Sequence, residues 1–253
     1  MTDKTALIQP DRGQDAVPIH LVNKDGFGAW ARALSAPQRA SLAAQKFEGG
    51  GHQFGIVPDG DGWFAVGGVA DPGKLSSWCV ARLAELLPAG TYRLAQGQPG
   101  AALHGWQTGQ YAFTRYKAPE NPVGPRVLLT KDVKAIESAV AEARAVALVR
   151  DLVNTPAEDM GPAALEAEAE KLAKAHGAKL EVARGDALAK DYPMIHAVGR
   201  AAAREHAPRL IHLTWGKAND PALAIVGKGV CFDSGGLDVK NASGMLLMKK
   251  DMG

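Results

Sequence analysis

The segment AIVGKGVCFDSGGLDVKNASGMLLMKKDMG, which runs from Ala224 to Gly253, holds four lysines and three aspartates, and four of these residues are candidates for chemistry. They are Lys228, Asp233, Lys240 and Asp251. Carboxylates bind divalent cations, and a lysine ammonium can stabilise negative charge that develops during a reaction. The segment is therefore the first candidate for a site that carries chemistry.

An apolar run, ALAIVGKGVCF, leads into these residues. Its near-continuous apolar character is typical of a central strand that is covered on both faces, and we expect such a strand here. Asp233 would then lie at the carboxyl end of the strand, where open α/β sheets bind their ligands. Lys228 would lie within the strand, so its ammonium must either extend to the rim or find a partner.

The residue types and their spacing are also compatible with a purely structural role for these residues. A single aspartate at the end of a strand more often caps a turn than binds a ligand. No HExxH motif accompanies the acids, and the seven histidines are scattered along the chain. The GKG triplet lacks the spacing and the Ser/Thr of a phosphate-binding loop.

The elements that must position these residues fall into two parts. The first part alternates short apolar runs (IHLV, FGIVP, WFAVGGV) with helical patterns such as SSWCVARLAELLP, which is typical of an α/β domain. The segment YKAPENPVGPR, rich in proline, is the best candidate for a linker. We predict an N-terminal α/β domain over residues 1–123.

The second part, over residues 124–253, is predicted to begin a second α/β domain. VLLT is a candidate strand, and residues 131–153 have the spacing of a long helix. A second helix follows Pro162 and ends at Gly177, because proline suits a first turn and glycine a C-terminal cap. KLEVA and PRLIHLTW are further candidate strands. The predicted fold class is α/β with two domains.

Composition excludes several classes of protein. The chain has 253 residues and a formal net charge of +2, so nothing in it calls for nucleic acid or an anionic membrane as a partner. It has two cysteines, which provide no disulfide framework. The N-terminus lacks the pattern of a secretory signal, and no apolar run approaches the ~20 residues of a membrane helix. We expect a cytoplasmic protein.

The run VGKGVCFDSGGLDVK with MLLMKKDMG after it resembles the leucyl (cytosol) aminopeptidase family of di-metal exopeptidases. RDLVNTPAEDMGP and YPMIHAVGRAAAREHAPRLIHLTWG resemble the same family in the same order. The resemblance extends from about Arg126 to the last residue, and GWQTGQYAFTRYK resembles the family's preceding segment. It implies an α/β/α catalytic domain, of which this chain holds the first part, after a smaller N-terminal α/β domain.

The resemblance also implies roles for single residues. Lys228, Asp233 and Asp251 match metal ligands of the family, with Asp233 bridging two divalent ions, manganese or zinc. Lys240 matches the catalytic lysine. The implied substrate is a peptide with a free N-terminus, from which a leucine-like residue is removed. The full-length enzyme is implied to be a homo-oligomer, commonly a hexamer.

The family's pattern continues with an acidic segment that supplies further metal ligands, and this sequence ends before it. We therefore expect residues 1–253 to be inactive alone. An alternative function is a non-catalytic module that binds a ligand or nucleic acid through its N-terminal half. The GGG at Gly49–Gly51 is its only phosphate-loop-like feature, and a loop between a helix and a strand explains it equally well.

Overall fold

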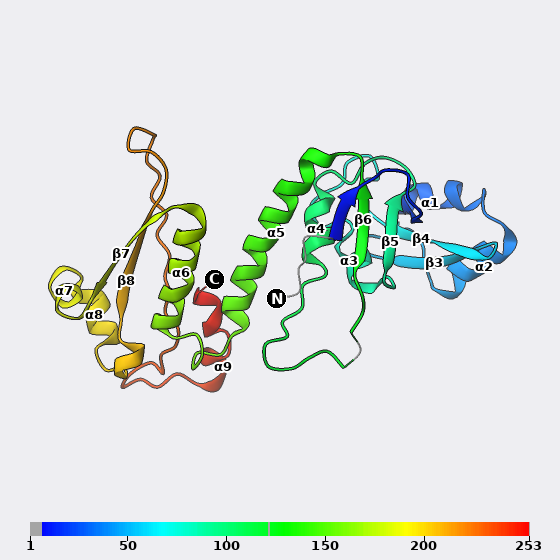
Figure 1. The fold of residues 1–253 in the computed structure, drawn as a ribbon. Coiled ribbons are helices and arrows are strands. Elements are labelled where there is room, and N and C mark those ends of the chain that lie inside the picture. The colour runs from blue at the N-terminus through cyan, green and yellow to red at the C-terminus, as the bar shows by residue number, and fades with distance from the viewer. Residues whose placement is uncertain (1–6, 121, 253) are drawn as a thin grey trace. The chain divides into compact units, whose positions relative to one another are not determined.

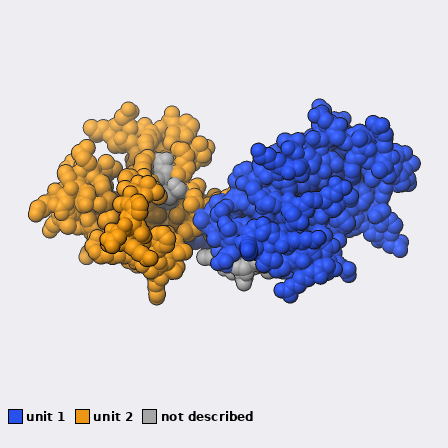
Figure 2. Space-filling view, turned by 90° about the horizontal axis from the view of Figure 1, so that it is seen from above, with its two compact units in different colours: residues 1–147 blue, residues 148–253 orange. Residues whose placement is uncertain are grey.

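The computed structural model describes residues 7–120 and 122–252, except for the side chains of residues 251 and 252. The chain forms two compact units, residues 1–147 and residues 148–253 (Figures 1 and 2). No helix in the described ranges is long and apolar enough to cross a membrane.

The first unit is built on a six-stranded sheet with the order β1-β6-β5-β2-β4-β3. All neighbouring strands are parallel except β3, which pairs with β4 in an antiparallel hairpin. Its elements are β1 (Ile8–Pro10), β2 (Val17–Val22), α1 (Lys24–Ala31), α2 (Ala36–Ala44), β3 (Phe54–Asp59), β4 (Gly62–Gly68), α3 (Ala81–Leu86), β5 (Gly90–Leu94), α4 (Ala102–Thr108), β6 (Arg126–Thr130) and the beginning of α5 (Val133–Asn154).

Alternation along the strands gives this sheet two apolar faces, each covered by helices. Ala65 of β4 packs on one face, against a cluster that includes residues of α3, α4 and α5. Its neighbours Phe64 and Val66 pack on the other face, against α1 and α2. The unit is therefore a three-layer α/β/α arrangement (Figure 1).

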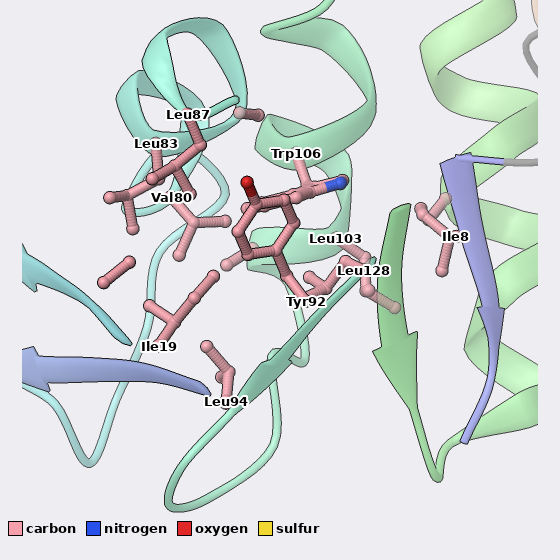
Figure 3. Packing of buried hydrophobic residues seen from close by; sticks show 14 of the residues in the cluster. Ile8, Ile19, Val80, Leu83, Leu87, Tyr92, Leu94, Leu103, Trp106 and Leu128 are labelled. Carbon is pink, nitrogen blue, oxygen red and sulfur yellow. The ribbon is translucent and has the colours of Figure 1, made fainter. Parts of the chain in front are cut away.

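Tyr92 and Trp106 form the centre of the larger cluster (Figure 3). Their ring centroids are 5.7 Å apart, and both side chains are fully buried. Each buried polar tip has a partner: the Tyr92 hydroxyl donates to the Pro88 carbonyl at 2.6 Å, and Trp106 Nε1 donates to the Arg126 carbonyl at 2.9 Å. Burial raises the pKa of Tyr92 to about 12.

The second unit contains the end of α5 and a two-stranded antiparallel sheet of β7 and β8. Its other elements are α6 (Pro162–His176), β7 (Lys179–Arg184), α7 (Gly185–Asp191), α8 (Pro193–Gly199), the 3₁₀ helix η2 (Arg204–His206), β8 (Arg209–Thr214), α9 (Ala242–Met245) and the 3₁₀ helix η3 (Met248–Met252). Helix α6 ends at Gly177, whose φ of 65° lies in the left-handed region that favours glycine.

A buried charge cluster connects α6 to this two-stranded sheet. The Glu166 side chain, 5% exposed, accepts from Arg209 at 2.6 Å and also forms an ion pair with Arg184. Arg184 and Arg209 are opposite each other in the β7–β8 register. A single carboxylate therefore binds one residue from each strand of the two-stranded sheet.

The helices at residues 131–153 and 163–177 are confirmed as α5 and α6, and the six predicted short strands are confirmed as β2, β3, β4, β6, β7 and β8, whereas β5 was not predicted. The expected central strand over ALAIVGKGVCF is wrong: residues 222–232 form no strand, and Ile225 and Val226 are 89% and 95% exposed. A strand requires hydrogen-bonding neighbours, and no described strand pairs with this segment. The apolar character of residues 222–232 was therefore not sufficient to specify a strand.

The sheet pairing also bears on where the domains divide. The strand predicted from VLLT is β6, which lies between β1 and β5 in the first sheet. The two compact units divide at residues 147 and 148. The boundary at residues 123 and 124 stays a prediction about the domains of the family.

Candidate active site

Asp233 lies in a tight turn that its own carboxylate helps to close. Oδ1 accepts from the Gly235 backbone N–H at 3.0 Å, and the Lys240 N–H donates to the Ser234 carbonyl at 2.8 Å. Gly235 has a φ of 99°, and a Cβ there would lie 2.4 Å from the carbonyl oxygen of Asp238. Glycine is thus required at this position both by conformation and by space.

The turn brings Lys240 against Asp233. Lys240 Nζ lies 2.7 Å from Oδ1 of Asp233, and the two side chains are 37% and 42% exposed. The hydrogen bond from Lys240 is the main cause that holds the pKa of Asp233 below its ordinary value, and the charge of Lys228 adds to it. Two of the four candidate residues, Asp233 and Lys240, therefore form a direct ion pair.

Lys240 also approaches a buried sulfur. Its Nζ lies 3.9 Å from Sδ of Met248, which is 5% exposed, at the start of η3. The short helix α9 between them is capped by Asn241, whose Oδ1 accepts from the Gly244 N–H at 2.7 Å. The Lys240 ammonium is therefore close both to the thioether of Met248 and to the carboxylate of Asp233.

Fewer contacts are described for the other two candidate residues, Lys228 and Asp251. Lys228 lies in the extended segment before the turn, and its charge acts on Asp233. Asp251 belongs to η3, but its side chain is outside the described part of the structure. The predicted meeting of Lys228, Asp233 and Asp251 at a common point stays a prediction, and the central strand that was to carry it is absent from residues 222–232.

Cys231 is buried two residues before Asp233. It packs with Leu152 and Met160 in a small apolar cluster. Burial raises the pKa of the Cys231 thiol, and burial lowers the pKa of the nearby Lys249. The apolar position in the sequence was a signal for burial, whereas the proximity of Lys249 requires the tertiary fold.

The donor chemistry of this site suits a divalent cation in part. Both described contacts to the Asp233 carboxylate involve Oδ1, so among the described residues Oδ2 accepts no hydrogen bond. A carboxylate and a neutral lysine amine are both possible metal ligands. Within the described ranges, no cluster of three or more His, Cys, Asp or Glu residues could hold a metal ion. The described donors are therefore the beginning of a ligand set.

Two family profiles match the sequence. Residues 17–128 match the profile described as "M17 aminopeptidase, N-terminal domain". Residues 147–253 match "Cytosol aminopeptidase family, catalytic domain". The two matches follow each other in the order of the two compact units.

Individual relatives agree with the profiles. A "Probable cytosol aminopeptidase" from Rhodococcus opacus is 38% identical over 172 residues, covering 61% of this chain and 33% of that protein. The crystal structure of a cytosol aminopeptidase from Coxiella burnetii has a TM-score of 0.83 and 33% identity, covering 97% of this chain and 54% of that one. The bottromycin maturation enzyme BotP, in complex with Mn, has a TM-score of 0.73 and 28% identity, covering 94% and 53%. The chain spans about half the length of these solved structures.

Proposed function

Because this chain belongs to the cytosol aminopeptidase family, we propose that it forms the N-terminal domain and the first part of the catalytic domain of a metal-dependent aminopeptidase. The observation that carries the proposal is the contact of Lys240 with Asp233, which joins the family's lysine to the carboxylate expected to hold metal. Their separation of 2.7 Å supports a common site.

In this proposal Lys228, Asp233 and Asp251 hold the cations. Two divalent ions, manganese or zinc, would supply Lewis acidity that polarises the scissile carbonyl of the peptide. The complex of BotP with Mn supports manganese as the first ion to try. Oδ2 of Asp233 is the described atom best suited to accept an ion, since both described contacts use Oδ1.

Lys240 would act on the substrate itself. Its ammonium lies beside the proposed ligand carboxylate, so it is within reach of a carbonyl oxygen bound there. A fixed positive charge at that point stabilises the negative oxygen of the tetrahedral intermediate. The substrate would be a peptide with a free N-terminus, and the complete enzyme would be a homo-oligomer.

The test is a chimera in which residues 1–253 replace the matching half of the Coxiella burnetii enzyme. We expect hydrolysis of leucine p-nitroanilide that depends on added Mn²⁺ and is lost in Asp233→Asn. Lys134→Gln, an exposed change on α5, is the control and should leave turnover unchanged. A chimera that unfolds cooperatively, binds Mn²⁺ and cleaves nothing would contradict the proposal.

A second measurement concerns residues 1–253 alone. We propose that they do not hydrolyse leucine p-nitroanilide with Mn²⁺ or Zn²⁺, because the described residues hold only the beginning of a ligand set. Turnover comparable to that of an intact aminopeptidase would show that no further segment is needed.

A further inference from the structure

The first unit contains a cavity that the proposed peptidase site does not use. Its volume is about 410 Å³, which is within the range of small-molecule sites. It lies at the carboxyl ends of three adjacent parallel strands, β1, β6 and β5, and Leu94 is at this end of β5 in Figure 3. This is the edge of an open α/β sheet where ligands bind.

Three charged residues line the cavity: Asp11, Arg93 and Lys131. Arg93 donates to Asp11 through Nε at 2.6 Å and through Nη2 at 2.9 Å, and Nη2 also donates to the Gln14 carbonyl at 2.7 Å. The pair with Arg93 fully offsets the charge of Asp11. The charge of Lys131 remains, so the charged lining has a net charge of about +1.

Both cations keep donors for a ligand. Among the described residues, none hydrogen-bonds to Nη1 of Arg93 and none pairs with the ammonium of Lys131, which follows β6 directly. The hydrogen bond from Arg93 lowers the pKa of Asp11 from 3.8 to about 2, and Lys131 contributes through its charge. The carboxylate is thus held ionised, which fixes the Arg93 guanidinium in place.

The rest of the lining contains both polar and apolar side chains. The loop after β5 adds the side chains of Gln96 and Gln98, and Gly97 between them has a φ of 73°. Leu94 and Leu129 supply apolar surface. A ligand with one oxyanion and a compact apolar body would match both kinds of lining.

We propose that this cavity in the first unit binds a small organic oxyanion, a phosphate or a carboxylate, through Lys131 and Nη1 of Arg93. The apolar body of the ligand would lie against Leu94 and Leu129. The binding is independent of the peptidase site, because every residue that lines the cavity belongs to the first unit.

The test uses residues 1–253 and isothermal titration calorimetry with three probes of similar size. Phenyl phosphate and benzoate carry the two oxyanions, and benzyl alcohol has the ring without the charge. We expect at least one anion to bind with a Kd below about 1 mM and benzyl alcohol to bind at least about tenfold more weakly. The stronger of the two anions identifies the headgroup.

Lys131→Gln should weaken anion binding by about tenfold, because it removes one charged hydrogen bond. Lys134→Gln makes the same change of charge three positions along the chain, on an exposed part of α5, and should bind as the unmodified chain does. Equal binding by both variants, equal binding of benzyl alcohol, or no binding of either anion would overturn the proposal. Thermal unfolding of each variant verifies that the fold is intact.

Discussion

At the scale of single residues, Lys240 separates charge stabilisation from metal binding. In the active chimera, we expect Lys240→Ala to lower turnover of leucine p-nitroanilide by about 10²–10³-fold, as the loss of an oxyanion donor does. Metal content, measured by elemental analysis, should remain nearly unchanged, since the lysine is not a proposed ligand. If metal is lost together with activity, the ion pair with Asp233 contributes to metal binding, and the role assigned to Lys240 is contradicted.

Asp11 provides a residue-scale prediction about pH. Its pKa is held at about 2 in the folded chain, against an ordinary value of 3.8, chiefly by the hydrogen bond from Arg93. A carboxyl group whose pKa is lowered by folding stabilises the fold above its unfolded pKa and loses that contribution as pH falls through the folded one. The contribution of Asp11 should therefore be complete above about pH 5, decrease most steeply between about pH 4 and pH 2, and vanish near pH 1.

Urea unfolding of the unmodified chain and of Asp11→Asn over this pH range measures the effect. The difference in the free energy of unfolding should shrink as pH falls from about 4 to about 2. Asp61→Asn, in the exposed turn between β3 and β4, is the charge-matched control. A difference that is constant over this range would contradict the role assigned to Asp11.

At the scale of elements, the cluster of Glu166 with two arginines holds α6 on the two-stranded sheet of β7 and β8. Glu166→Ala would leave the Arg209 side chain, 11% exposed, without its carboxylate. Removal of one partner from a buried ion pair costs about 3–5 kcal/mol. Arg184 is more than half exposed, so its share of that energy is small.

The loss should appear in urea unfolding of the second unit. Glu170→Ala, an exposed change on the same helix, should alter the free energy of unfolding by less than about 0.5 kcal/mol. If Glu166→Ala and Glu170→Ala destabilise the chain equally, the cluster does not anchor the helix.

The elements also show which features the sequence could predict. Helix α6 begins at Pro162 and ends at Gly177, and both signals lie within the segment itself. The strand expected over residues 222–232 depended on neighbours elsewhere in the fold, which a local apolar pattern does not specify. Its absence in the described structure is the main error in the predicted fold.

Some features of the candidate site could likewise be predicted from the sequence, and others could not. Asp233 was singled out by its residue type and its place after an apolar run, and the role of Lys240 was implied by the family resemblance; the structure places the two side chains in contact. The contact depends on the turn at Gly235, for which the glycine pair in the sequence was the visible signal. The cavity of the first unit was missed, because Asp11, Arg93 and Lys131 are far apart in the sequence and meet only where three strands end.

At the scale of the whole molecule, the first unit has what it needs to fold alone. Its sheet is covered on both faces, and its larger core is centred on Tyr92 and Trp106. We expect residues 1–154, which keep α5 whole, to unfold in one cooperative transition with near-ultraviolet circular dichroism from the packed aromatic rings. A gradual transition without that signal would mean that the first unit depends on the second.

The extended segment at residues 222–232 has a consequence for how copies of the chain behave together. Its side chains at Leu223, Ile225 and Val226 are more than four-fifths exposed, and no described strand pairs with its backbone. Extended apolar backbone of this kind is a template on which another copy can add as a β-strand. Residues 1–253 should accordingly form thioflavin-positive aggregates as concentration rises, and Val226→Lys, which adds a charge at the middle of the template, should suppress them.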